Sequence, residues 1–450
     1  MFATRWTCSR VRPFSCSLLL LLALPASGTA QQGAAAELAL PQMIEATLQS
    51  HPSSDAAAAR VEGAYEAREA VRASRLPNVS LGAELTRFAE PMVIAPLHAF
   101  DPTSPPGFDR TLVRSQLLVR YLVFDGGRRG AEINDAEAQL SGAGHLGDDV
   151  TAALIEATAA AYLEVLSARS MRDAAQSLVR ALEAELGRVS LSLSAGTAAE
   201  LEVLRANAAL QDATAKESTA EVRAQSAERA LARITGIPTE TISSDDLSRP
   251  SIDALRLPYE TRRTPMVLAA ESSVEAAEAR VQTERSRLVP QVEVEAGWLD
   301  FGTAAGDHVL EWQAGLRASW PLFTGGATRA AVRRAEADLS YAQAGLDVAR
   351  LRAEQEVDAA EAALLDALGR ARSLDASVAQ WEEVARIEAL ALDAGSGIQS
   401  DLLTAQAGLF QARAGLAQAE SDAALAAVTL ARARGELDQT WIDRVWGNPI

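Results

Sequence analysis

Two stretches of the chain alternate between apolar and polar residues with the two-residue period of a β-strand. The first contains residues 78–88 and 113–123, which are separated by the Pro-rich segment 91–108. That segment is typical of a long loop because proline and glycine interrupt regular structure. The second stretch shows the same alternation with a shorter connection. The pattern therefore predicts two β-hairpins, at 78–124 and 291–323.

One face of these strands is apolar and the other is polar. In the second strand of the hairpin at 291–323, Trp312 and Trp320 lie on the apolar face. Glu311 and Arg317 lie on the opposite face. Four strands cannot close a barrel, which needs about eight, and an open sheet exposes its edges. Closure therefore requires several chains, with both tryptophans facing lipid and a polar face lining a pore. The alternative is a soluble sandwich, in which another layer covers the apolar face.

Each predicted hairpin is followed by a very long helix, at 128–193 and at 327–393. At about 1.5 Å per residue, each helix is roughly 100 Å long. A shorter helix then returns along each of them, at 198–235 and at 398–434. In the second long helix, an apolar or small residue recurs at every seventh position, which predicts a coiled coil with its neighbours: Leu339, Leu346, Ala353, Ala360, Ala367, Leu374 and Trp381.

The chain contains the same order of elements twice, which indicates an internal duplication. Gly196 returns 199 residues later as Gly395, whereas upstream the offset is 213, so that Pro77 returns as Pro290. The sequence Phe-Asp-Gly-Gly returns as Phe-Thr-Gly-Gly. Glycine supplies the dihedral angles of a sharp corner, so this motif predicts the switch from strand to long helix at Phe124, Gly126, Gly127, Phe323, Gly325 and Gly326.

The duplication predicts the domain organisation. The first repeat covers 31–236 and the second covers 264–436, and each opens with a proline-bounded helix. A linker at 237–263 joins the repeats, and a tail at 437–450 follows them.

The first thirty residues have the order of a secretory signal peptide. Arg5, Arg10 and Arg12 precede an apolar run at 18–24, and small residues lead to a predicted cleavage after residue 30. The alternative is a membrane anchor, but the run is shorter than the roughly 20 residues that a spanning helix needs. Because no later segment holds about 18 consecutive apolar residues, we expect no helical membrane span.

Composition and charge narrow the functional classes further. A formal charge of −18 is unfavourable for binding nucleic acid. Both cysteines, Cys8 and Cys16, precede the predicted cleavage position, so the mature chain offers no disulfide or thiolate site. The histidines are scattered without metal-ligand spacing: His51, His98, His145 and His308. We therefore predict no enzyme activity, no cofactor and no bound metal.

With these features together, the chain resembles the TolC-type outer-membrane efflux proteins. The resemblance rests on Trp-Pro-Leu-Phe-Thr-Gly-Gly at 320–326, its weaker copy at 121–127, and the glycine turns at Gly196 and Gly395. It covers nearly all of the mature chain. It implies a homotrimer whose twelve strands form one β-barrel in the outer membrane of a Gram-negative bacterium, continued by a coiled-coil α-helical barrel in the periplasm. It also implies a periplasmic adaptor and an inner-membrane pump of the RND, ABC or MFS class.

The resemblance assigns roles to residues near the helical turns. It places the hairpin tips at the periplasmic mouth, where adaptors dock: Gly196, Thr197, Gly395 and Ser396. It places Asp401, with Glu202 at the equivalent position, near a closed constriction. Similar proteins often carry a second acid three residues on, but this chain has Thr404 there, which leaves a single acidic ring. The alternative readings are a simple turn for each tip and a solvated charge for each acid.

Two functions from different classes therefore stand. The first is a passive exit channel of a tripartite efflux or type I secretion system. The second is a soluble periplasmic scaffold or adaptor. An adaptor needs a single helical hairpin with compact β domains, whereas this chain has two hairpin pairs with apolar strand faces, so the channel is favoured.

Overall fold

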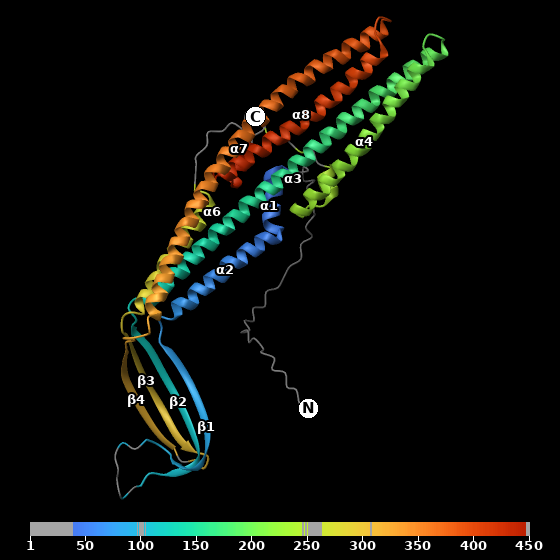
Figure 1. The fold of residues 1–450 in the computed structure, drawn as a ribbon. Helices are drawn as coiled ribbons and strands as arrows, with labels where there is room; N and C mark the ends of the chain where they lie inside the picture. The colour runs from blue at the N-terminus through green and yellow to red at the C-terminus, as the bar shows by residue number, and fades with distance from the viewer. Residues whose placement is uncertain are drawn as a thin grey trace, which may run out of the picture. The chain divides into compact units, whose positions relative to one another are not determined.

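The computed structural model describes residues 39–446, apart from residues 97, 99–102, 104, 245–246, 248–249, 251–262 and 307. The predicted signal peptide at 1–30 lies outside the described residues, as do residues 447–450 of the predicted tail. One sheet is connected directly to the long helices, and the turns between long and returning helices lie at their far ends (Figure 1).

The sheet has four antiparallel strands in the order β1-β2-β3-β4. They are β1 (Asn78–Val93), β2 (Phe108–Phe124), β3 (Gln291–Thr303) and β4 (His308–Ser319). The middle pair, β2 and β3, joins the two repeats, and β1 and β4 are the edges.

One face of the sheet is apolar and exposed in the single chain. A row of large side chains crosses all four strands in register, since Leu81 pairs with Leu117, Leu117 with Trp298, and Trp298 with Trp312. Leu81 is 81% exposed and Trp312 is 75% exposed. No second sheet covers this face in the described part of the chain, which argues against the soluble sandwich.

The strands differ from the sequence prediction at both ends. β1 continues through Pro91 to Val93, so the predicted loop at 91–108 is too long. The β1–β2 register shifts between Arg87 and Met92, and such an irregular stretch tolerates a residue without an N–H group. β4 ends at Ser319, so Trp320 lies just beyond the strand, where its indole Nε1 donates to the carbonyl oxygen of Leu288 at 3.0 Å.

The long helices form the rest of the structure. They are α2 (Pro52–Ala73), α3 (Arg128–Ser194), α4 (Glu200–Thr235), α6 (Pro265–Ser286), α7 (Ala327–Asp393) and α8 (Gln399–Ala433). α3 packs against α2, α4, α6 and α8, and α7 packs against α6 and α8. Both returning helices begin slightly later than their predicted bounds of 198–235 and 398–434.

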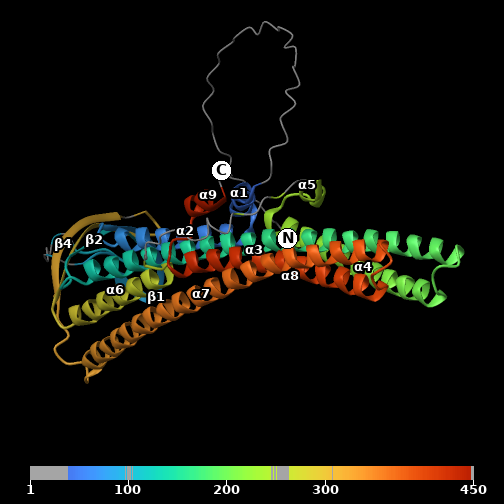
Figure 2. The same cartoon turned by 90° about the horizontal axis from the view of Figure 1, so that it is seen from above.

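Three short helices were not predicted from the sequence. α1 (Leu40–Ser50) precedes the first proline-bounded helix, α5 (Thr239–Ser244) lies in the predicted linker, and α9 (Gln439–Trp446) lies in the predicted tail. α1 and α9 lie beside each other (Figure 2). The predicted tail at 437–450 thus contains a helix, and Trp441 and Ile442 of α9 are buried against the core.

The main core lies where these short helices meet the middle of α3. Tyr162, Met43 and Ile442 are fully or almost fully buried there. α3 is apolar enough over 18 residues to cross a membrane, but 56% of that stretch is buried inside the protein. More than half of this apolar stretch therefore packs inside the protein.

Elsewhere the helices pack through narrow seams of small residues. The predicted heptad positions Ala360 and Ala367 of α7 are buried. On α8, a Cβ atom added at Gly408 would lie 2.8 Å from Cε3 of Trp381, so only glycine leaves room for this indole ring. Small residues thus allow two long helices to pack closely over many turns.

Candidate functional site

The face of the sheet opposite the apolar row carries paired charges of both signs. The Nε atom of Arg120 donates to Oε2 of Glu295 across the β2–β3 pair at 3.0 Å. Arg317 stands opposite Glu293 in the β3–β4 register, and Arg114 lies over the ring of Phe301, 5.4 Å from its centroid. A polar face that carries charges of both signs suits the water-filled interior of a barrel.

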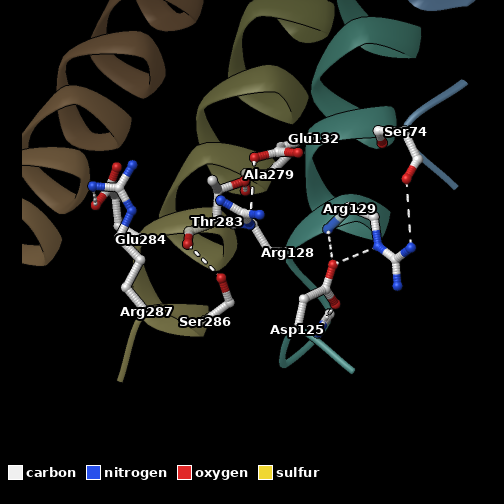
Figure 3. A network of polar contacts seen from close by, with 11 residues as sticks. Ser74, Asp125, Arg128, Arg129, Glu132, Ala279, Thr283, Glu284, Ser286 and Arg287 are labelled. Carbon is white, nitrogen blue, oxygen red and sulfur yellow. Dashed lines mark hydrogen bonds and ion pairs between the residues drawn. The ribbon is translucent and has the colours of Figure 1, made fainter. Parts of the chain in front are cut away.

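Asp125 organises the corner where β2 becomes α3 (Figure 3). Its Oδ1 accepts the backbone N–H of Gly127 at 3.0 Å, and its Oδ2 accepts the backbone N–H of Arg129 at 3.0 Å. The Arg129 Nε also donates to Oδ2 at 2.8 Å, and Arg129 Nη1 donates to the carbonyl oxygen of Ser74 at the end of α2. One carboxylate therefore caps α3 and connects it to α2.

The electrostatics of Asp125 favour its ionised form. The residue is only 6% exposed, and this burial raises the pKa of the carboxyl group. Hydrogen bonds from Arg129 and Gly127, together with the Arg129 charge, outweigh burial, so the pKa is lowered below its ordinary value.

The six residues predicted for the corners lie at the two strand-to-helix junctions. All four glycines have positive φ: Gly126 at 66°, Gly127 at 86°, Gly325 at 61° and Gly326 at 89°. This left-handed conformation favours glycine. The second corner replaces Asp125 with Thr324, whose Oγ1 accepts the backbone N–H of Thr328 at 3.4 Å.

Asp125 and Arg129 were not among the residues predicted from the sequence. An available signal was the acidic residue just before a long helix, where carboxylates satisfy free backbone N–H groups. No local sequence pattern indicates the hydrogen bond from Arg129 to Ser74, because the two residues belong to different elements of the chain.

The hairpin tips are built alike in both repeats. Gly196 and Gly395 have φ values of 74° and 76°. The backbone N–H of Thr197 donates to Ser192 O and that of Ser396 donates to Ala391 O, each at 2.9 Å. These bonds satisfy the last carbonyl groups of the long helices. The tips expose large apolar side chains: Leu191, Leu201, Leu204, Leu390 and Ile398.

A buried polar cluster joins the two helical hairpins just inside the tips. Gln399 Nε2 donates to Oε1 of Glu185 and to the backbone carbonyl of Glu202, each at 3.2 Å. Glu185 also accepts two bonds from Arg188, each at 2.8 Å. The Glu185 hydrogen bonds, together with the charges of Asp393 and Glu202, raise the pKa of Arg188. The cluster therefore ties α8 to α3 and α4.

The predicted constriction residues lie beside this cluster. Glu202 and Asp401 are each the third residue of their helix, α4 and α8. Asp401 is exposed and accepts the Ser400 hydroxyl at 3.3 Å, whereas Thr404 Oγ1 donates to the carbonyl oxygen of Ser400 at 2.8 Å. The side chains of Thr404 and Asp401 thus contact Ser400 rather than each other. Among the described residues, no cluster of His, Cys, Asp and Glu side chains is suited to hold a metal ion.

Comparison with known proteins identifies the family. Residues 43–237 and 260–436 match the outer membrane efflux protein family. The chain belongs to this family. It is 28% identical over 349 residues to protein CyaE of Bordetella pertussis, covering 73% of this chain and 71% of CyaE. It is 24% identical to the outer membrane efflux protein BepC of Brucella suis, covering 73% of each chain.

Solved structures share the fold of this outer membrane efflux protein. The outer membrane protein VceC of Vibrio cholerae aligns with a TM-score of 0.72 at 22% sequence identity, over 88% of this chain and 96% of VceC. The predicted fold class is confirmed: β-barrel strands continue into long coiled-coil helices, and the architecture is duplicated within the chain.

Membership of the family settles the choice between the two functions. This outer membrane efflux protein is the exit duct of an efflux or secretion system, located in the outer membrane and extending into the periplasm. The alternative of a soluble periplasmic scaffold or adaptor is therefore set aside.

The corner carboxylate yields a prediction about stability. Replacing Asp125→Asn should lower the free energy of unfolding at pH 7 by about 1.5–3 kcal/mol, the range for hydrogen bonds to a charged group. Because the folded pKa of Asp125 lies below its ordinary value of 3.8, its contribution is present above pH 3.8 and is lost as the pH falls further. Thermal unfolding at pH 7 and in steps below pH 3.8 should therefore show the two proteins converging.

The second corner supplies the control. Thr324→Ala removes the corresponding cap without removing a charge, so its effect should not vary over this pH range. If the loss of stability caused by Asp125→Asn stayed constant down to the lowest pH measured, the ionised Asp125 carboxylate would not be the source of the stabilisation.

Proposed function

We propose that three copies of this chain form one passive channel through the outer membrane. A single chain supplies a four-stranded sheet with an exposed apolar face and two open edges. An open edge is not tolerated in lipid, because its N–H and C=O groups have no partner there. This open, one-sided apolar sheet is the observation that carries the proposal. Three copies would supply twelve strands, which is enough to close a barrel.

The channel itself performs no chemistry in this proposal. An inner-membrane pump of the RND, ABC or MFS class supplies the energy, and a periplasmic adaptor joins the pump to the channel. The mixed charges on the polar strand face, such as Arg120 and Glu295, support a passage that accepts cargo selected by the pump.

Trimerisation in the outer membrane is the first test. The mature chain, extracted from separated membranes in a mild detergent, should have the native mass of three chains and should come from the outer-membrane fraction. Native mass spectrometry measures the first quantity and density-gradient separation the second. A monomer in the soluble periplasm would refute the proposal.

The hairpin tips are proposed as the adaptor-docking surface. Gly196, Thr197, Gly395 and Ser396 make the turns, and the flanking apolar side chains of Leu191 and Ile398 are 72% and 62% exposed in the described part of the chain. Exposed apolar side chains that cluster at the ends of helices are typical of a protein-binding surface.

A photo-crosslinking residue tests this docking surface. Placed at Leu191 in intact cells, it should join the channel to a periplasmic protein that carries a long helical hairpin, identified by mass spectrometry. Val222, which is 60% exposed in the middle of α4, is the matched control and should give no such product. Equal yields at both positions would argue against docking at the tips.

Asp401 is proposed to form an acidic ring at the constriction, flanked by Thr404 and Glu202. In a trimer, three Asp401 carboxylates around one axis would attract cations. Asp401→Ala should therefore weaken block by divalent cations in single-channel recordings, by about tenfold in the blocking concentration if most of the local charge is lost.

Asp375→Ala is the control, since it removes another exposed carboxylate, from α7. It should leave the block unchanged. If Asp401→Ala changes neither the conductance nor the divalent block, Asp401 does not line the constriction.

A further inference from the structure

The two repeats correspond residue by residue in the structure. In the first hairpin Asn78 pairs with Arg120, and in the second Gln291 pairs with Ser319. The offsets of 213 and 199 residues that relate the repeats in sequence carry the first pair onto the second. The register follows the same rule as far as the pair Arg87 and Thr111, whose counterpart is Asp300 and Leu310, and it departs from the rule at the irregular end of β1. Over this length the strands of the two hairpins are structural equivalents.

An ion pair between helices obeys the same offsets. Arg72 of α2 lies 3.4 Å from Glu137 of α3, and Arg285 of α6 lies 2.8 Å from Glu336 of α7. The correspondence therefore extends from the sheet into the helices.

The second strand and long helix of the first repeat contact the first strand and first helix of the second repeat. β2 of the first repeat pairs with β3 of the second, and α3 packs against α6. The reverse contact, from β4 to β1 and from α7 to α2, is missing in the described part of the chain, where β1 and β4 are the edges of the sheet. On α7, Tyr341 is 83% exposed. A neighbouring copy can supply the missing contact.

The corner glycines show the same asymmetry at atomic detail. A Cβ atom added at Gly126 would lie 2.0 Å from Cγ2 of Val289, so Val289 fills the space beside this glycine. The equivalent glycine, Gly325, has nothing within 4 Å of its added Cβ. The counterpart of Val289 by the offset is Leu76, which is 69% exposed. At the second corner, the space beside Gly325 is therefore open within the chain, and Leu76, the residue that corresponds to Val289, is exposed.

We propose that β4 of one protomer pairs antiparallel with β1 of the next in the register set by the repeat, with Ala318 opposite Ala83. The in-chain counterpart is the β2–β3 pair Val119 and Ala296. In the same arrangement Leu76 of the next protomer packs on Gly325. The inference rests on the proposed closed channel and specifies the register and contacts between its protomers.

This register matches both faces of the sheet. On the apolar face, Leu316 stands opposite Leu85, as Leu117 stands opposite Trp298 within the chain. On the polar face, Arg317 stands opposite Glu84, which brings opposite charges together. A slip by one residue would turn the apolar side chains of one strand toward the polar face. The alignment that the repeat specifies is therefore also the chemically complementary one.

Disulfide formation between protomers tests the register. The full-length chain is expressed with Ala83→Cys and Ala318→Cys, and oxidised in native membranes; both natural cysteines lie within the predicted leader. A second pair, Glu84→Cys with Arg317→Cys, samples the polar face, because successive antiparallel pairs alternate between closer and wider spacing. Register-shifted controls combine Ala318→Cys with Leu81→Cys or with Leu85→Cys. In-chain references are Val119→Cys with Ala296→Cys, and Arg120→Cys with Glu295→Cys.

At least one matched pair should form disulfide-linked multimers, roughly tenfold more than the shifted controls, because a two-residue slip moves the thiols by about 7 Å, beyond disulfide reach. Shifted pairs that react as well as matched pairs would overturn the register. The register would also be overturned if both matched pairs stayed reduced in trimeric samples while the in-chain reference variants oxidised under the same conditions. Native mass on the same sample separates the two claims, since a monomer would refute the proposed channel itself.

Discussion

The constraint on which this structure depends is that every backbone polar group placed in lipid needs a partner within the protein. The four-stranded sheet meets this requirement for β2 and β3 but leaves one edge of β1 and one edge of β4 unpaired. Its exposed apolar face, with the row from Leu81 to Trp312, is unfavourable in water and favourable against lipid. A single chain is therefore an incomplete unit.

Duplication offers a simple route from one chain to a closed ring, because each repeat presents the same edges and can pair with the next. The two repeats nevertheless meet different neighbours, and the corners record this difference. Asp125 binds Arg129, which reaches Ser74, whereas Thr324 caps its helix alone. The space beside Gly126 is occupied by the Val289 side chain, whereas the space beside Gly325 is empty within the chain. Duplicated residues thus diverge in their surroundings where one repeat contacts its own chain and the other faces the chain boundary.

The helices extend far from the sheet with little core to support them. Their seams rely on small residues such as Ala360 and Gly408, which permit close packing but bury little area per residue. Two features add local support. One is the core around Tyr162, where α1 packs on α3 and α9 packs on α1. The other is the polar cluster at Gln399, which holds α8 to α3 and α4 close to the tips.

The sequence by itself determined the faces of the strands, the lengths of the long helices, the repeat offsets and the glycine turns at Gly196 and Gly395. These features follow from local periodicity and local dihedral preference, so neighbouring residues carry the information. Only the tertiary structure decided that residues 439–446 form a helix, because Trp441 and Ile442 are buried by contacts with α1, nearly 400 positions earlier. The same holds for the bond from Arg129 to Ser74 and for the bridge from Gln399 to Glu185. Each joins residues far apart in the chain, and no periodic pattern reports which distant side chains will meet.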